Sequence, residues 1–268
     1  MERISQALEL ARRDRERSRE ALATVVPPLQ PPPARPATVT RSPRVHLSPE
    51  VLERHRILSG DSDEQTRQAY KMLRTQVMQR MNEHGMQTLA IVSPTRGEGK
   101  SLTACNLAIS IADGTDRTAL LVDFDLHRPA VQQMFGLALE HGFDDYLRGV
   151  CSLQQAICRP DEYERLALLP VRAPITGSSE LLSGTRVRDL VRELKGRYPD
   201  RIVLFDLPPV LATDDALAFS PCVDAALIVA CEGRTKRDDL VRTLELLHST
   251  RIVGTVLNRS SEPGAGVY

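Results

Sequence analysis

The sequence predicts a doubly wound α/β fold with a mainly parallel sheet, and three observations lead to this prediction. Six near-continuous apolar runs recur along the chain, as is typical of parallel strands buried on both faces. Stretches with helical periodicity lie between them, and this alternation favours right-handed strand–helix–strand crossovers. Acidic and polar residues follow several of the runs, at the strand ends where sheets of this kind bind their ligands.

The elements can be assigned in order along the chain. The expected strands are Leu89–Ser93, Ala119–Asp123, Leu166–Leu169, Ile202–Asp206, Ala225–Ala230 and Ile252–Leu257. Helical patterns cover Leu58–Met81, Ser101–Ile111, Val187–Arg197 and Lys236–Leu247. With 268 residues, of which 41% are apolar, the chain has room for one large domain and its appendages.

The chain divides into four parts on composition. Residues 1–22 predict an amphipathic helix, which is either a solvated, marginal helix or a docking helix for a partner. Residues 23–57 are expected to be a linker, because its proline-rich part favours extended polyproline conformations. The α/β domain is expected over residues 58–260. Residues 261–268 are expected to be a flexible, Gly/Pro-rich tail that ends in Tyr268.

Composition excludes some function classes. Lys+Arg and Asp+Glu both number 35 and there is no Trp, so neither charge nor aromatic content favours nucleic-acid binding. The five cysteines form no CxxC pair, which favours free thiols in a reducing cytosol. No apolar run reaches the roughly 18 residues that span a bilayer. We therefore expect a cytoplasmic protein whose membrane role, if it has one, depends on a partner.

The strongest motif is SPTRGEGKSLTACNLA at Ser93–Ala108, which follows a strand and opens a helix. Gly97 and Gly99 let backbone N–H groups approach a phosphate, and the helix N-terminus favours an anion. Lys100 can reach the β- and γ-phosphates, and the Ser101 hydroxyl can bind Mg²⁺. This segment predicts a Walker A loop for ATP. The expected nucleotide contacts are Thr95, Arg96, Gly97, Glu98, Gly99, Lys100, Ser101 and Leu102.

A second motif, LLVDFDLHRP at Leu120–Pro129, places two carboxylates at a strand end. One of Asp123 and Asp125 can hold the metal, directly or through water, while the other accepts the proton of an attacking hydroxyl. The alternative is that these carboxylates cap the next turn.

The first motif also has an alternative. Pro94 stands where the GxxxxGK[ST] pattern has its first glycine, so that segment could be a purely structural glycine-rich turn.

A third motif, RIVLFDLPPVLATDDA at Arg201–Ala216, ends a strand in Asp206. That is the position of a Walker B aspartate, which orders the metal shell, and the two prolines after it stop the strand. We interpret Asp214 and Asp215 as N-cap residues of the next helix. Three strand-end motifs in this order predict an ATP·Mg²⁺ site in a P-loop NTPase fold.

These segments resemble those of the CpsD/CapB-type bacterial tyrosine kinases, a branch of the MinD/ParA-like P-loop ATPases. The resemblance covers roughly Ser59 to Ser260. It includes the loop SPTRGEGKS, which is similar to the family's SPTPGEGKS, and the aspartate and DxPP motifs. SSELLSG at Ser178–Gly184 and GTVLNRS at Gly254–Ser260 are also similar to family segments. Thr95 stands where MinD/ParA ATPases carry their signature lysine, as in the kinases.

The resemblance implies roles for individual residues. Lys100 and Ser101 would bind phosphate and Mg²⁺, and Asn258 would contact the adenine. The implied catalytic set is Lys100, Asp123, Asp125 and Asp206, and the implied metal set is Ser101, Asp123 and Asp206.

The chain departs from the family pattern at three places. The family ends in a tyrosine cluster, whereas the tail SEPGAGVY offers only Tyr268, which is either a phospho-acceptor or an ordinary terminal residue. The family's ExxRxxR oligomerisation motif corresponds to QAYKMLR, in which Gln68 replaces the glutamate, Lys71 replaces the first arginine and Arg74 keeps the second. His127 stands where the family's DxDxR motif has arginine, and Arg128 follows it.

The resemblance implies an exopolysaccharide-associated tyrosine autokinase that controls capsule or polysaccharide chain length or export. Its implied activator is a membrane polysaccharide co-polymerase of the Wzz type, which would recruit it to the inner face of the membrane, and homo-oligomers are among the implied assemblies. The alternative is a non-kinase regulatory ATPase that dimerises with nucleotide. A nucleotide-binding scaffold is a third reading, against which Lys100 and the three aspartates argue.

Overall fold

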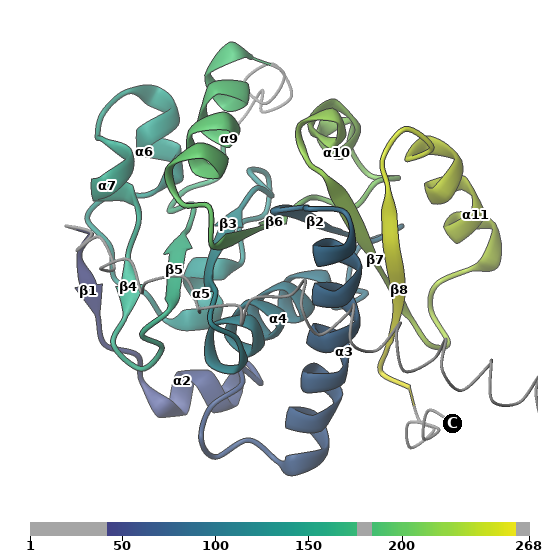
Figure 1. Cartoon of the computed structure of the whole chain (residues 1–268), viewed down its shortest axis with the longest axis horizontal. Helices are drawn as coiled ribbons and strands as arrows, with labels where there is room; N and C mark the ends of the chain where they lie inside the picture. The colour runs from purple at the N-terminus through teal and green to yellow at the C-terminus, as the bar shows by residue number, and fades with distance from the viewer. Residues whose placement is uncertain (1–41, 176–183, 261–268) are drawn as a thin grey trace, which may run out of the picture. The chain divides into compact units, whose positions relative to one another are not determined.

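The computed structural model describes residues 42–175 and 184–260 (Figure 1). Its centre is a six-stranded sheet in the order β5-β3-β6-β2-β7-β8, in which all neighbours are parallel. Each strand matches an expected apolar run to within one residue at either end, so the predicted doubly wound parallel fold is confirmed. The strands are β2 (Thr88–Val92), β3 (Thr118–Asp123), β5 (Leu166–Leu169), β6 (Arg201–Asp206), β7 (Ala225–Cys231) and β8 (Ile252–Asn258).

Four longer helices correspond to the predicted helical patterns: α3 (Glu64–Glu83), α4 (Lys100–Gly114), α9 (Thr185–Arg197) and α11 (Arg237–Leu246). Helix α3 begins later than residue 58 because Asp63 caps it, its side chain accepting the Thr66 N–H at 2.7 Å. The shorter elements are α5 (Val131–Phe135), α6 (Phe143–Arg148), α7 (Leu153–Ala156), α10 (Asp215–Phe219) and the 3₁₀ turn η1 (Ser220–Cys222).

Successive strand residues point to opposite faces of the sheet and enter two separate cores. In β2, Leu89 and Ile91 pack with side chains from α3, α4 and α5, whereas Ala90 and Val92 pack with side chains from α6, α9 and α10. Figure 1 shows α3 and α4 on one side of the sheet and α9 and α10 on the other. Burial on both faces explains why the strands are almost purely apolar in sequence.

An aromatic cluster fixes the chain where β3 ends. Phe124 follows the last residue of β3, and its ring centroid lies 4.1 Å from that of Phe219 and 5.4 Å from that of Phe205. All three rings are fully buried. Pairs of this kind contribute about 0.5–1.5 kcal/mol each beyond their burial. The cluster holds the start of the acidic loop against β6 and α10.

The segment before α3 is more structured than the sequence indicates. The linker was expected to reach residue 57, but β1 (Arg44–Val45) pairs with β4 (Arg159–Pro160), and α2 (Pro49–Arg54) follows. Leu47 and Leu52 are buried in the core. Val51 lies against Gly136 at the C-terminal end of α5, where an added Cβ would approach its side chain to 2.9 Å. Residues 42–57 therefore belong to the folded unit rather than to a linker.

The predicted helix at 1–22, the proline-rich segment up to residue 41 and the tail at 261–268 lie outside the described residues. Within the described residues, no helix is both long enough and apolar enough to cross a membrane. All five cysteines are unpaired, as their spacing predicted.

Candidate active site

The loop between β2 and α4 carries the first motif, and two glycines determine its path. Gly97 has a φ angle of +78° and Gly99 one of +92°, conformations that are strained for residues with a Cβ. A Cβ on Gly99 would also collide with the side-chain amide of Asn258. Helix α4 begins at Lys100, directly after the loop. The unpaired N–H groups of a first helical turn favour anions, so this backbone suits a phosphate.

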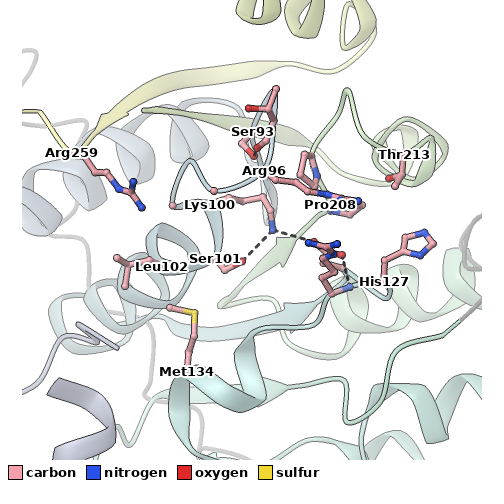
Figure 2. A pocket seen from close by; sticks show the side chains of 16 residues that line it. Ser93, Arg96, Lys100, Ser101, Leu102, His127, Met134, Pro208, Thr213 and Arg259 are labelled. Atoms are coloured by element: carbon pink, nitrogen blue, oxygen red, sulfur yellow. Dashed lines mark hydrogen bonds and ion pairs between the residues drawn. The ribbon is translucent and has the colours of Figure 1, made fainter. Parts of the chain in front are cut away.

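Lys100 extends from the start of α4 into a group of oxygen atoms (Figure 2). Its Nζ donates to Asp206 Oδ1 at 2.5 Å and to Ser101 Oγ at 3.3 Å, and it lies 3.9 Å from Asp125 Oδ2. Only 7% of the lysine side chain and none of the Asp206 side chain is exposed. A buried carboxylate requires such a counter-ion. The sheet therefore brings the P-loop lysine to the aspartates of the second and third motifs.

Asp123 and Asp206 lie side by side because β3 and β6 pair in register at these two residues. The Oδ2 atom of Asp123 accepts the N–H groups of Ala130 and Val131, both at 2.9 Å, and its Oδ1 accepts the N–H of Asp125 at 3.2 Å. Burial, followed by the nearby Asp206 carboxylate, raises the pKa of Asp123 to about 8. Asp123 thus also caps the turn that follows it, as the alternative interpretation expected.

Asp125 differs from Asp123 in its contacts. It lines the cavity next to Lys100, and its Oδ1 accepts the N–H of Arg128 at 3.0 Å. Burial raises its pKa above the usual value, and Lys100 opposes this rise. A carboxylate with a raised pKa is a stronger proton acceptor.

The residues at this point fit Mg²⁺ by their chemistry. Asp206 Oδ2 is buried and has no hydrogen-bond partner within the described part of the chain. The hydroxyl of Ser101 lies on the same side, next to the Lys100 ammonium. Mg²⁺ prefers hard oxygen ligands and is usually held by one or two protein oxygens together with phosphate and water. Ser101 and Asp206 fit this role directly, whereas both oxygens of Asp123 already accept backbone N–H groups.

The side chain of Glu98 stabilises the phosphate loop through hydrogen bonds. Its side chain is fully buried and accepts the Thr95 N–H at 2.9 Å, the Thr95 hydroxyl at 3.0 Å and the Thr235 hydroxyl at 2.6 Å. Thr235 lies after β7 and in turn accepts the N–H of Cys231. The expected contact of Glu98 with a nucleotide would therefore use its main chain, because its carboxylate is already engaged.

Asn258 ends β8 and lies against the same loop. Its Nδ2 donates to the Glu98 carbonyl at 2.9 Å, and its Oδ1 accepts the N–H of Arg259 at 2.9 Å. Asn258 also lines a groove of about 1080 Å³ between α2, α3, α4 and β8. Its contact with adenine stays a prediction, and the structure adds a contact to the loop itself.

A cavity of about 340 Å³ lies over the phosphate loop (Figure 2). Of the residues predicted for the site, it is lined by Thr95, Arg96, Gly97, Gly99, Lys100, Ser101, Leu102 and Asp125. It is also lined by residues for which no binding role was predicted, namely Ser93, His127, Arg128, Met134, Pro208, Pro209, Thr213 and Arg259. Asp123 and Asp206 lie behind this surface rather than on it.

One contact at the cavity corrects the interpretation of Asp214 and Asp215. Asp214 occupies the N-cap position of α10, but its side chain makes no capping hydrogen bond. Asp215 is fully buried, and its Oδ2 lies 3.1 Å from His127 Nε2. The pair joins the acidic loop after β3 to α10. The departure from the family pattern at residue 127 was the only sequence signal for it.

Residues of the stretch that corresponds to the oligomerisation motif form contacts with other parts of the same chain. Arg74 Nη1 donates to the Ser110 carbonyl at 3.0 Å, and its guanidinium packs against Gly114 of α4. Lys71 lies 3.8 Å from Glu64, whereas Gln68 is exposed. Tyr268, the predicted phospho-acceptor, lies outside the described residues.

The fold and this site define a class of protein. One similar solved structure is that of the septum site-determining protein MinD from Pyrococcus horikoshii, complexed with Mg-ADP. The match has a TM-score of 0.55 and covers 65% of this chain and 72% of the MinD chain, and the two sequences are 24% identical. No protein-family model matches the sequence. The chain thus has the fold of the MinD-like P-loop ATPases.

Sequence relatives narrow the class. The tyrosine-protein kinase YwqD of Bacillus subtilis is 29% identical over 209 residues, which are 77% of this chain and 86% of the relative. The kinase domain of the Escherichia coli tyrosine kinase ETK matches with a TM-score of 0.65 and 26% identity, over 82% of this chain and 99% of that domain. The chain is therefore similar in sequence and in fold to bacterial tyrosine-protein kinases.

Other relatives are longer than this chain. The succinoglycan biosynthesis transport protein ExoP of Rhizobium meliloti is 33% identical over 188 residues, which are 67% of this chain but only 23% of ExoP. The chain therefore corresponds to most of YwqD and to about a quarter of ExoP. One relative is thus named as a protein of succinoglycan biosynthesis and transport.

Proposed function

We propose that this chain is an ATP-dependent protein-tyrosine kinase that phosphorylates itself and regulates the synthesis or export of an exopolysaccharide or capsule. The observation that carries the proposal is the meeting of Lys100 with Asp206 at 2.5 Å and with Asp125 at 3.9 Å, at the open end of a phosphate loop. Phosphoryl transfer needs positioned positive charge, a metal shell and a proton acceptor. Lys100 supplies the positive charge, Asp206 contributes to the metal shell, and Asp125 is the proton acceptor.

The chain's own residues act by positioning and by proton transfer. ATP·Mg²⁺ would supply the phosphoryl group. The N–H groups of the loop at Gly97–Ser101 hold its phosphates, and Lys100 exchanges Asp206 for a phosphate oxygen. Ser101 and Asp206 would hold the metal ion, and Asp123 fixes the turn beside them by accepting the N–H groups of Ala130 and Val131. Asp125, at the cavity surface, accepts the proton of the incoming tyrosine hydroxyl.

The acceptor is proposed to be Tyr268 of another copy of the chain or a tyrosine of a different protein. A phosphate on a tail tyrosine adds about −1.5 to −2 charges at neutral pH, and neighbouring tails then repel one another. A membrane polysaccharide co-polymerase of the Wzz type is the proposed activator, and it would bring the kinase to the inner face of the membrane. Relatives in polysaccharide biosynthesis and transport support this assignment.

The test is labelling with γ-labelled ATP and Mg²⁺, with and without the cytoplasmic segment of the co-polymerase. Wild type, Lys100→Met and Tyr268→Phe are compared, and released phosphate is counted separately. Label that disappears in both variants supports an autokinase with Tyr268 as its acceptor. Label lost only in Lys100→Met keeps the kinase and moves the acceptor elsewhere.

The second candidate is a regulatory ATPase that uses the same site with water as the nucleophile. The contact of Arg74 with Ser110 favours it, because the one arginine kept from the oligomerisation motif is bound within the chain. Phosphate release without any protein label, even with the co-polymerase segment present, would exclude the autokinase and leave this function.

A further inference from the structure

The cavity over the phosphate loop carries a surplus of positive charge. Four cationic side chains line it, and of these Lys100 is paired with Asp206. The guanidinium groups of the other three, Arg96, Arg128 and Arg259, have no hydrogen-bond or ion-pair partner within residues 42–175 and 184–260. Unpaired cations around one cavity favour a polyanionic ligand.

Arg259 approaches this cavity from a side that none of the three motifs covers. It is the first residue after β8, and Figure 2 shows its side chain and that of His127 on opposite sides of Lys100. It also lines the larger groove next to α3 and α4, as does Leu102. Arg259 therefore lies where the phosphate cavity and the larger groove meet.

The backbone that carries Arg259 is tied to the phosphate loop. Its φ angle is +58°, in the left-handed region that costs free energy for a residue with a Cβ. Its N–H donates to Asn258 Oδ1, while Asn258 Nδ2 donates to the Glu98 carbonyl, both at 2.9 Å. Strained residues that their surroundings hold in place are typical of ligand sites. The path of the phosphate loop thus sets the position of Arg259.

We propose that Arg259 is a further nucleotide-binding residue, whose guanidinium binds the phosphate chain of ATP from the β8 side, on the side of Lys100 opposite to His127. The inference rests on the nucleotide site proposed above and adds a contact that the three motifs do not supply. A guanidinium suits this role, because its planar fork of N–H donors matches two oxygens of a phosphate and stays charged at any physiological pH.

The test measures binding rather than phosphoryl transfer. Mg²⁺ complexes of ATP, ADP and tripolyphosphate are titrated calorimetrically into wild type, Arg259→Gln, Arg259→Lys and the control Arg242→Gln, which removes an exposed arginine of α11. Arg259→Gln is expected to weaken all three ligands by about tenfold, the size of one lost charge-assisted contact. Arg259→Lys should lose less, and Arg242→Gln should match wild type.

The variants are matched in backbone cost, since Arg, Gln and Lys are equally disfavoured at a positive φ, so the unfolding temperature of the ligand-free protein should stay unchanged. Equal affinities of wild type and Arg259→Gln for all three ligands would remove Arg259 from the site. A loss for ATP and ADP that spares tripolyphosphate would assign Arg259 to the nucleoside and overturn the phosphate contact. If the wild-type protein bound ATP but labelled no protein, the proposed kinase activity would be excluded, whereas the proposed contact of Arg259 with ATP would still hold.

Discussion

Lys100 and Asp206 are joined by a 2.5 Å contact between Nζ and Oδ1, with 7% and 0% of their side chains exposed. The lysine that is expected to bind phosphate is thus already bound to a carboxylate from β6. In the proposed function, nucleotide binding would replace this carboxylate with a phosphate oxygen as the partner of Lys100. Asp206 Oδ1 would then be open to a metal ion together with Oδ2, which has no hydrogen-bond partner within the described residues.

Lys100→Met should destabilise the ligand-free protein by about 1–3 kcal/mol, because it leaves the Asp206 carboxylate buried without a counter-ion. The double variant Lys100→Met/Asp206→Asn should recover most of this loss, since the second change removes the unpaired charge. Urea unfolding at pH 7 measures both. A single variant as stable as wild type would show that the ion pair contributes nothing to the fold.

The raised pKa of Asp123 predicts that the stability of the protein depends on pH. Its pKa is about 8 in the folded protein, above the ordinary value of 3.8, so the folded state binds its proton more tightly than the unfolded state does. The contribution is complete below pH 3.8 and is lost as the pH rises through about 8. The free energy of unfolding should therefore fall across this range, by at most about 1.4 kcal/mol per pH unit from this group.

Asp123→Asn removes the titrating group. The difference in free energy of unfolding between variant and wild type should shift in favour of the variant as the pH rises from 5 to 8. Asp116→Asn, which changes a fully exposed aspartate, serves as the control and should run parallel to wild type. Parallel curves for Asp123→Asn as well would mean that Asp123 keeps an ordinary pKa.

Thr235→Val should weaken ATP binding although Thr235 does not line the phosphate cavity. The change removes the 2.6 Å hydrogen bond that Thr235 donates to Glu98, so the phosphate loop loses one of the interactions that hold its conformation. We expect a loss of about 1 kcal/mol, or roughly fivefold in affinity. Calorimetry on Thr235→Val, Glu98→Ala and the double variant gives the coupling energy. Additive losses would show that the two residues act independently, and Thr243→Val, in α11, is the control.

The His127–Asp215 contact predicts which substitutions residue 127 tolerates. His127→Ala should destabilise the protein by about 1–2 kcal/mol, because Asp215 is fully buried and loses a partner. His127→Arg should keep most of the stability, since a guanidinium can also pair with that carboxylate. Thermal unfolding of both variants, alone and with Asp215→Asn, decides this. Equal loss for Ala and Arg would point to packing rather than to the pair.

The sequence predicted what depends on local pattern. Strands such as β5 were placed correctly because burial on both faces leaves an apolar run with sharp ends. The meeting of Lys100, Asp125 and Asp206 also followed, since parallel strands bring their carboxyl ends to one edge of the sheet. These features need no knowledge of contacts between distant side chains.

The contacts that the sequence did not predict join residues far apart in the chain. Glu98 and Thr235 are separated by 137 positions, and no local pattern links a threonine after β7 to a glutamate in the phosphate loop. Residues 42–57 were assigned to the linker because prolines dominate the composition before them. Leu47 and Leu52 nevertheless find places in the core, and α2 has its own cap at Ser48.

The packing of Val51 against Gly136 has a mechanical consequence. Helix α2 rests on the C-terminal end of α5, and the N-terminal end of α5 supplies the N–H groups that hold the Asp123 carboxylate. A displacement of α2 would therefore reach that carboxylate through the five-residue α5. Helix α2 and the Asp123 carboxylate, which lies beside Asp206, are thus mechanically coupled through a single short helix.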